Sequence, residues 1–155
     1  MVFEEILWGE SMDSIDLKII DILQTDGRIT MKELGQRVGL TSPATIERVK
    51  KLEDSGIIGG YRADIDIAKA GLPVRAFILV TAASQSAAAF VDFVRSHPCL
   101  LDCHRLAGGA SYLVSAAVTD TAALESVLDE LAPFGNAVTY LVLSTPVAGK
   151  KIELS

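Results

Sequence analysis

The sequence is poor in the features that mark disulfide-bonded, membrane-spanning or secreted proteins. Two cysteines in 155 residues cannot form a disulfide framework. No apolar run reaches the roughly 18 residues that a membrane helix needs. The start of the chain lacks basic residues and contains Glu4, Glu5 and Glu10, so it does not look like a secretory signal. Half of the residues are hydrophobic, which is enough for a folded core, and we expect a soluble cytoplasmic protein.

Basic residues are also scarce, and their distribution is uneven. The 14 Lys and Arg residues are outnumbered by 20 Asp and Glu, and the resulting net charge of −6 by itself argues against a nucleic-acid partner. Residues 1–27 carry −6 and residues 63–155 carry −3, whereas residues 28–62 carry +3. A local basic segment matters more for phosphate contact than the total charge does. A solvated helix face would give the same local charge, so charge alone does not decide between the two.

The first third of the chain has the periodicity and the end signals of three helices. Apolar residues recur at helical spacing from Ile15 to Leu23, from Leu34 to Val38 and from Ile46 to Leu52. Each stretch follows residues that cap a first turn: Asp13 or Ser14, the capping-box motif Thr30-Met-Lys-Glu33, and Thr41-Ser42-Pro43. Each is followed by a glycine that favours a helix end: Gly27, Gly39 and Gly56.

The second and third of these helices are spaced as in a helix-turn-helix. Gly39 suits the sharp turn between them, and the small Gly35 lies where two crossing helices must approach closely. In such a unit the third helix reads the major groove of DNA. We assign Ile46, Val49 and Leu52 to its inner face, and a helical repeat then directs four other residues outward: Ala44, Glu47, Arg48 and Lys51.

The predicted DNA contacts combine these outward positions with the helix start and with flanking basic residues. Arg28 and Lys32 are assigned to phosphates, and Glu47 either accepts from a cytosine amino group or pairs with Lys51. The full predicted set is Arg28, Lys32, Ser42, Ala44, Thr45, Glu47, Arg48, Lys50, Lys51 and Arg62.

Strand-like residues follow the third helix. The stretch 57–65 predicts a short hairpin, or wing, beside the reading helix, with Arg62 reaching the DNA backbone. For Tyr61 the alternative is simple packing against the third helix. The predicted DNA-binding domain, including the N-terminal segment, covers residues 1–64, and a linker covers residues 65–73.

Residues 74–155 read as an α+β domain of order βαββαβ, the ferredoxin-like arrangement. Strands are predicted over 74–81, 100–107, 112–118 and 137–144, and helices over 86–96 and from Asp120 or Thr121 to Leu131. Two helices cover only one face of such a sheet. Phe77 and Leu79 nevertheless make the second face of the first strand apolar as well. The uncovered face therefore predicts a homodimer in which the same sheet of a second copy covers it.

Two further features of the sequence give little information about function. His97, Cys99, Cys103 and His104 are close in sequence but lack ligand-like spacing, so we predict no metal, no cofactor and no catalytic residue. Residues 1–11 contain Phe3, Ile6, Leu7 and Trp8, and they either dock on a neighbouring subunit or stay loose.

Taken together, these patterns resemble the Lrp/AsnC (feast/famine) family of transcription regulators over about residues 12–150. The residues that carry the resemblance are Met12-Asp-Ser-Ile-Asp16, Gln24-Thr-Asp-Gly-Arg28, Glu33-Leu-Gly-Gln-Arg-Val-Gly-Leu40, Glu47-Arg-Val-Lys-Lys-Leu-Glu53, Ser55-Gly-Ile-Ile58, Gly60-Tyr61, Asp102-Cys-His-Arg105, Gly108, Tyr112 and Thr139-Tyr140. The resemblance implies a winged helix-turn-helix, a ferredoxin-like regulatory domain, and dimers that assemble into tetramers or octamers. It also implies a small effector, commonly an amino acid, bound between regulatory domains.

The turn that helps form the effector pocket in this family departs from the usual pattern. Family members usually read Gly-Asp-x-Asp-Tyr there, and this chain reads Gly108-Gly109-Ala110-Ser111-Tyr112. Without the two carboxylates, an ammonium group loses its natural partner. Two interpretations fit: Gly108, Gly109, Ser111 and Tyr112 bind a different ligand, partly through backbone N–H groups, or the chain binds no effector.

Two other functions remain as alternatives to a sequence-specific DNA-binding regulator. Some Lrp-like proteins are sirohaem decarboxylases, but a tetrapyrrole site needs histidines around a large pocket, and only His104 lies in the expected region. An effector-binding module with a secondary DNA role is the other alternative, and the retained basic residues argue against it.

Overall fold

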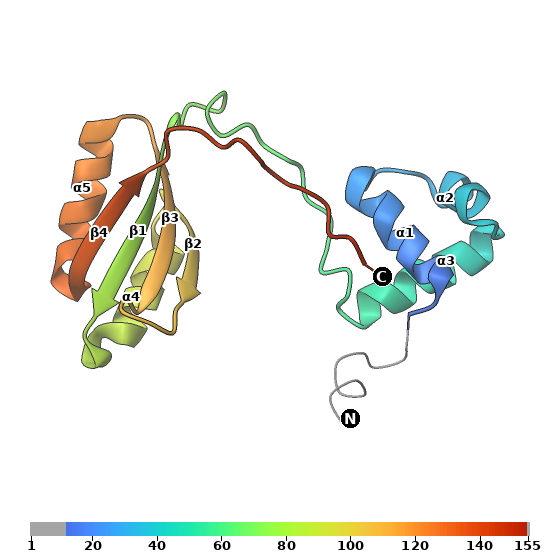
Figure 1. The fold of residues 1–155 in the computed structure, drawn as a ribbon, viewed down its shortest axis with the longest axis horizontal. Coiled ribbons are helices and arrows are strands. Elements are labelled where there is room, and N and C mark those ends of the chain that lie inside the picture. The colour runs from blue at the N-terminus through green and yellow to red at the C-terminus, as the bar shows by residue number, and fades with distance from the viewer. Residues whose placement is uncertain (1–11, 155) are drawn as a thin grey trace. The chain divides into compact units, whose positions relative to one another are not determined.

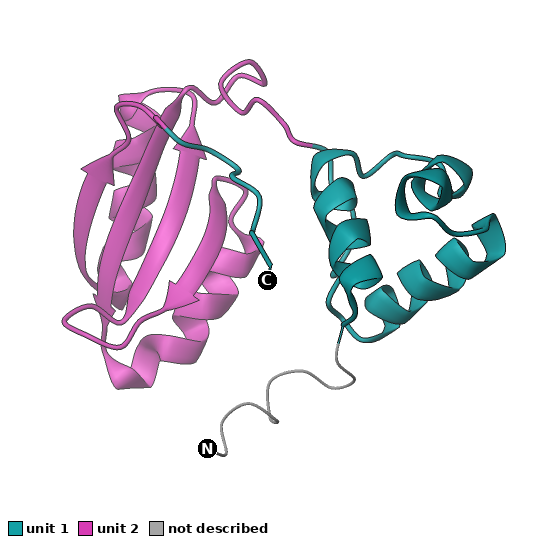
Figure 2. Ribbon diagram, turned by 45° about the vertical axis from the view of Figure 1, so that its right-hand side comes forward, with its two compact units in different colours: residues 1–63, 147–155 teal, residues 64–146 magenta. Residues whose placement is uncertain are grey.

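The computed structural model describes residues 12–154, and these residues form two compact units (Figures 1 and 2). A helical unit contains residues 12–63 together with residues 147–154, and a sheet unit contains residues 64–146. By their contacts residues 147–154 group with the helices, whereas the sequence analysis counts them with the sheet domain. The predicted linker also groups with the sheet unit. The apolar segment 1–11 lies outside the described residues.

The helical unit contains three helices: α1 (Ser14–Thr25), α2 (Met31–Val38) and α3 (Ser42–Asp54). Their ends confirm the predicted caps. The carboxylate of Asp13 accepts the backbone N–H groups of Ile15 and Asp16, and the hydroxyl of Thr30 accepts that of Glu33. Gly39 has φ of 77°, the left-handed conformation that the turn between α2 and α3 requires.

A small apolar core holds these helices together. Its buried residues come from all three helices and from the α1–α2 loop: Ile19, Ile20, Ile29, Leu34, Val49 and Leu52. The tightest approach is between α2 and α3 at Gly35. A Cβ atom there would lie 2.7 Å from Oγ1 of Thr45 and 2.8 Å from the carbonyl oxygen of Leu40. Only glycine therefore lets these helices cross at this distance, as the sequence predicted.

The predicted wing is wrong. The described chain from Ser55 to Pro73 contains turns and extended segments but no strand. Tyr61 instead packs back on the helical unit, and its hydroxyl donates to Oε1 of Glu53 on α3 over 3.0 Å. The stretch thus follows the alternative interpretation, packing of Tyr61 against the third helix.

The sheet unit has the predicted βαββαβ order: β1 (Val74–Ala82), α4 (Ala87–Ser96), β2 (Leu100–Arg105), β3 (Tyr112–Val118), α5 (Thr121–Leu131) and β4 (Gly135–Leu141). Short 3₁₀ turns precede α4 and follow α5. The strands pair antiparallel in the order β2-β3-β1-β4. This is the ferredoxin-like arrangement.

The core of the sheet unit lies between one face of the sheet and helices α4 and α5. Ile78, Val80 and Val114 point into it from the central strands, and Phe90 and Leu131 meet them from the helices; all five are fully buried. The opposite face of the sheet has no helix of this unit on it (Figure 1).

Candidate nucleic-acid interface

Helix α3 is rotated relative to the sequence prediction. Thr45 is fully buried, with Val49 and Leu52 next to it on the inner face, whereas Ile46 is 52% exposed. The hydroxyl of Thr45 donates to the carbonyl oxygen of Thr41 over 2.9 Å, so its polar atom is satisfied inside the unit. The assignments of Thr45 to DNA contact and of Ile46 to the core are therefore both wrong.

The solvent face of α3 follows from this rotation. Four exposed residues lie within about one third of the helix circumference, given a turn of about 100° per residue: Pro43, Ile46, Glu47 and Lys50. The half-buried Ser42 and Ala44 flank them on either side at the helix start. The exposed Lys51 lies on the same side of the helix as Ala44. The outward surface thus combines an apolar centre with a carboxylate and with lysines toward the helix end.

Arg48 is engaged within the unit rather than presented to a ligand. Its Nη1 atom lies 2.8 Å from Oδ2 of Asp13 and 2.8 Å from Oδ1 of Asp16. Only 32% of its side chain is exposed. The guanidinium connects α3 to the first turn of α1, so the prediction that Arg48 reads bases is corrected to a structural bridge.

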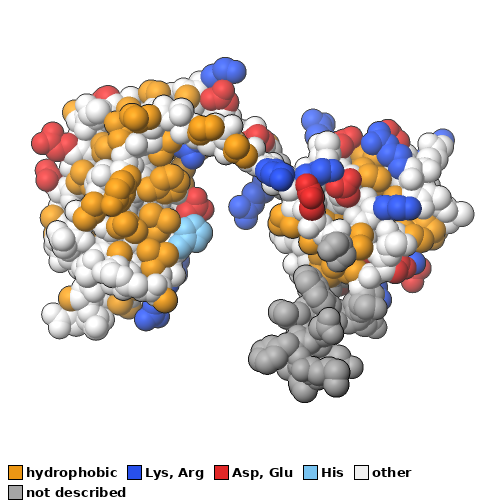
Figure 3. All heavy atoms as spheres, in the orientation of Figure 1, with side chains coloured by type: hydrophobic (Ala, Val, Ile, Leu, Met, Phe, Trp, Pro, Cys, Tyr) orange, Lys and Arg blue, Asp and Glu red, His pale blue; other side chains and the backbone are white. Residues whose placement is uncertain are grey.

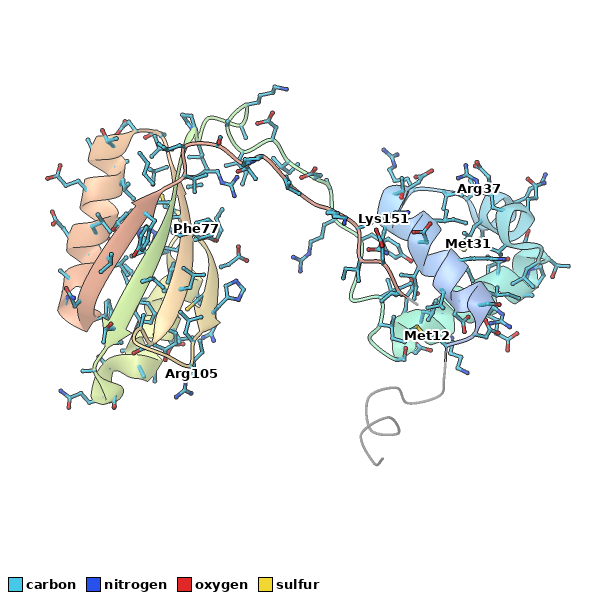
Figure 4. The ribbon with its side chains drawn as sticks, viewed as in Figure 1. Met12, Met31, Arg37, Phe77, Arg105 and Lys151 are labelled. Carbon is cyan, nitrogen blue, oxygen red and sulfur yellow. The ribbon has the colours of Figure 1, made fainter. Side chains whose placement is uncertain are left out.

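The remaining predicted contacts are at the surface. Arg28 lies in the loop before α2, Lys32 lies in the first turn of α2, and Arg62 lies in the extended segment after α3; all three are exposed. Arg37 on α2 is also exposed, but it pairs with Glu33 over 2.7 Å (labelled in Figure 4). Arg28 and Lys32 therefore supply positive charge at the start of α2.

Sequence reasoning missed Ile46 as a surface residue. A threonine in a helix can return its hydroxyl to the backbone carbonyl of the residue four positions earlier and so be buried with its hydrogen bond satisfied, as Thr45 does with Thr41. Every residue has that carbonyl group, so the sequence around Thr45 carried no signal for its burial. Hydrophobicity alone favours Ile46 for the core, and it therefore gave the wrong rotation.

The predicted effector turn lies between β2 and β3. Gly108 and Gly109 are exposed there. The N–H of Ser111 already donates to the carbonyl oxygen of Val80 over 2.9 Å. That N–H group is therefore bonded within the sheet unit, whereas the sequence analysis predicted that it binds a ligand.

Tyr112 is an internal residue of the sheet unit. It is 6% exposed, and its ring centre lies 4.8 Å from that of Phe90. Its ring belongs to the core between the sheet and α4. The assignment of Tyr112 as an effector-contacting side chain is corrected accordingly.

The cysteines and histidines do not converge. Cys99 and Cys103 are half-buried free thiols, and burial raises the pKa of the Cys103 thiol. Within residues 12–154, no three His, Cys, Asp or Glu side chains are grouped so as to hold a metal ion. In the same range, no helix is both long and apolar enough to cross a bilayer.

Comparison with known proteins agrees with this architecture. Residues 12–53 match the AsnC-type helix-turn-helix domain, and residues 75–152 match the Lrp/AsnC ligand binding domain. The chain is 42% identical over 134 residues to the uncharacterized HTH-type transcriptional regulator YezC of Bacillus subtilis, covering 86% of this chain and 95% of that protein. It is 34% identical to LrpC of the same organism over 86% of this chain and 92% of LrpC.

Solved structures give the same result. The structure of B. subtilis LrpC aligns with a TM-score of 0.84 at 33% identity, covering 87% of this chain and 96% of that one. An L-Met complex of a transcriptional regulator from Neisseria meningitidis aligns with a TM-score of 0.84 at 35% identity, covering 89% and 94%. The protein is thus a two-domain DNA-binding transcription regulator, not an enzyme. It belongs to the Lrp/AsnC family.

Proposed function

We propose that this regulator binds double-stranded DNA with the exposed face of α3 in the major groove. The observation that carries the proposal is the arrangement of Ile46, Glu47 and Lys50 on one solvent face of the second helix of a helix-turn-helix. Ser42 and Ala44 lie at the N-terminal end of α3, which usually enters the groove. Because the partner is DNA, we place the protein in the cytoplasm.

Phosphate contacts come from the exposed basic residues around α3. Arg28 and Lys32 lie before and in the first turn of α2, and Lys50, Lys51 and Arg62 lie toward the end of α3 and beyond it. Neutralising phosphates releases counterions, so affinity falls with salt. The number of phosphates neutralised sets how steep this dependence is, and the repulsion between DNA and the rest of a chain of total charge −6 is itself screened as salt rises.

A fluorescence-anisotropy titration of the full chain against promoter DNA tests the proposal. Lys50→Ala is expected to weaken binding and to lower the salt slope by about 1 for each copy of α3 in the complex. Lys69→Ala removes the same charge from an exposed residue of the sheet unit, so it is the matched control and is expected to leave the salt slope unchanged. Equal affinities and slopes for wild type and Lys50→Ala would contradict the placement of α3.

We also propose a homodimer formed through the open face of the sheet. Phe77, Val138 and Tyr140 are 40%, 48% and 55% exposed, and Phe77 lies beside Tyr140 in the register of β1 and β4. Leu79 is flanked by Leu113 and Val138 on the neighbouring strands. Hydrophobic side chains gather on the sheet unit in Figure 3, and Figure 4 labels Phe77 on β1. A second copy of this surface covers it symmetrically.

Light scattering with size-exclusion chromatography tests the dimer. Phe77→Asp buries a charge in the proposed interface and is expected to give monomers at micromolar concentration. Ala89→Asp, on the exposed side of α4, is the control. The wild-type mass also distinguishes a dimer from the tetramer or octamer proposed for its further assembly. A monomeric wild type would refute the interface.

We propose in addition that a small metabolite, an amino acid or a related compound, binds at the turn between β2 and β3. The support is the match to a ligand binding domain and the exposed, acid-free turn at Gly108 and Gly109. Without a carboxylate, the site favours ligands that accept hydrogen bonds over those held by an ammonium group.

Restoring an acid tests this site. A Cβ at Gly109 meets no atom within 4 Å, so Gly109→Asp fits without a clash. Isothermal titration with the standard amino acids is expected to show stronger binding to Gly109→Asp than to wild type. Equal binding of these amino acids by both proteins would contradict the proposed effector site.

A further inference from the structure

Ile46 is a large apolar residue of α3 that is not packed in the core of the helical unit. Among α1, α2 and α3 it is the only large apolar side chain that lies exposed, at 52%. The inner face of α3 is already filled by Thr45, Val49 and Leu52. An isoleucine in water gains nothing for stability, since its burial is what stabilises a fold.

The neighbours of Ile46 show which kind of surface it belongs to. Pro43 and Lys50, three residues before and four after, lie on the same side of α3, and all three are exposed. Glu47 is exposed beside it. A carboxylate is repelled by phosphates, so a face centred on Ile46 and Glu47 suits base edges better than the DNA backbone. Lys50 then lies on the side of the phosphates.

Base edges in the major groove offer one apolar group, the C5 methyl of thymine. The other groups on these edges are hydrogen-bond donors and acceptors, which an isoleucine cannot pair. An apolar side chain on the reading face of α3 therefore distinguishes thymine from cytosine by contact with this methyl.

We propose that Ile46 is a specificity-determining residue that packs against the C5 methyl of a thymine in each of the two half-sites that the two α3 helices of the proposed homodimer contact. This inference rests on the proposed insertion of α3 into the major groove. It adds a base identity to that proposal and assigns it to one side chain.

The test uses duplexes selected from a random library by the full-length wild-type chain. Thymidine is replaced by deoxyuridine, which lacks only the methyl, at one symmetric pair of positions at a time. At one pair of positions, the loss of the methyl contact is expected to lower wild-type affinity about fourfold for each half-site, which is the cost of losing one buried methyl group. Ile46→Ala is expected to bind the thymidine and deoxyuridine duplexes equally at that position. Ile65→Ala, another exposed isoleucine at 60%, is the control and keeps the wild-type discrimination.

The outcomes separate this inference from the proposed function. Enrichment of no duplex would refute DNA reading by α3 and the inference with it. Wild-type binding that ignores deoxyuridine at every position would overturn the inference alone. A deoxyuridine effect of equal size in wild type and Ile46→Ala would also overturn it, because another side chain would then contact the methyl. The wild-type comparison needs no variant, so it can overturn the inference even where Ile46→Ala folds poorly.

Discussion

Nη1 of Arg48 lies 2.8 Å from Oδ1 of Asp16, and this contact connects α3 to α1, the first helix of the same unit. Asp13, the N-cap of α1, accepts from the same nitrogen atom. A guanidinium beside two carboxylates is neutralised locally, so it adds little to the field that attracts DNA. Positive residues on α3 thus serve two purposes: Arg48 fixes the position of α3, and Lys50 remains at the surface.

This division of roles predicts that substitutions at Arg48 and at Lys50 affect different properties of the protein, its stability and its DNA binding. Arg48→Ala leaves Asp13 and Asp16 without their cation and is expected to lower the free energy of unfolding by about 1 kcal/mol, since the pair is only partly buried. Lys50→Ala is expected to leave the melting temperature unchanged while weakening DNA binding. Thermal denaturation and anisotropy titrations on both variants measure the two effects. A wild-type melting temperature for Arg48→Ala would argue against the bridge.

Local signals made the helix ends and the order of elements predictable. The carboxylate of Asp13, the hydroxyl of Thr30 and the left-handed Gly39 act within four residues, and each appears in the fold as the sequence indicates. The alternation of apolar residues likewise predicted the four strands and the open face of the sheet.

Contacts between distant residues account for what the sequence did not predict. The rotation of α3 depends on Thr45 meeting Gly35, which no local pattern encodes. The partner of Arg48 lies 32 residues earlier, at Asp16. Gln24 is hydrogen-bonded to Ile152 in the C-terminal tail, residues 147–154. The two residues are 128 positions apart, so no pattern near either of them predicts this contact. For the same reason, the solvent face of α3 was wrongly assigned although the helix itself was correct.

The close approach at Gly35 predicts a large cost for a single methyl group. In Gly35→Ala the new Cβ would lie 2.7 Å from Oγ1 of Thr45 and 2.8 Å from the Leu40 carbonyl oxygen. We expect a loss of about 2 to 3 kcal/mol in the free energy of unfolding, measured by urea denaturation. Gly59→Ala is the control, since a Cβ there meets no atom within 4 Å. Adding Thr45→Ala should not rescue the variant, because the backbone contact remains; full rescue would contradict this explanation.

The N-cap of α1 predicts a loss of stability in acid. The pKa of Asp13 is lowered from 3.8, first by the hydrogen bond from the backbone N–H of Asp16 and also by Arg48. Because the folded state binds this proton less tightly than the unfolded state does, the contribution of Asp13 is complete above its ordinary pKa and is lost as pH falls through the lowered value. Asp13→Asn keeps a cap but cannot titrate, so its melting temperature should fall less steeply with pH below about 4. Asp64→Asn is the charge-matched control, and equal acid slopes for wild type and Asp13→Asn would refute the prediction.

The contacts between the C-terminal tail and α1 are a further source of stability in the helical unit. The side-chain amide of Gln24 on α1 accepts the N–H of Ile152 over 2.8 Å and donates to its carbonyl oxygen over 3.1 Å. Lys151 also pairs with Asp21, and Figure 4 labels it on the tail beside α1. Ile152 and Leu154 line an apolar groove of about 410 Å³ together with α1 and residues 57–61. The tail is therefore held by two hydrogen bonds between the Gln24 side-chain amide and the backbone of Ile152, by one ion pair and by apolar contact.

Removing the amide should release the tail without unfolding the helices. Gln24→Ala deletes both hydrogen bonds and is expected to cost about 1 kcal/mol, because the groups are exposed and water replaces the lost partners. Hydrogen exchange should then become faster at the Ile152 amide and stay unchanged in the core of α3. Gln36→Ala, an exposed glutamine on α2, is the matched control. Wild-type exchange at Ile152 in Gln24→Ala would mean that the groove, rather than the glutamine, holds the tail, and Ile152→Ser would then be the variant that frees it.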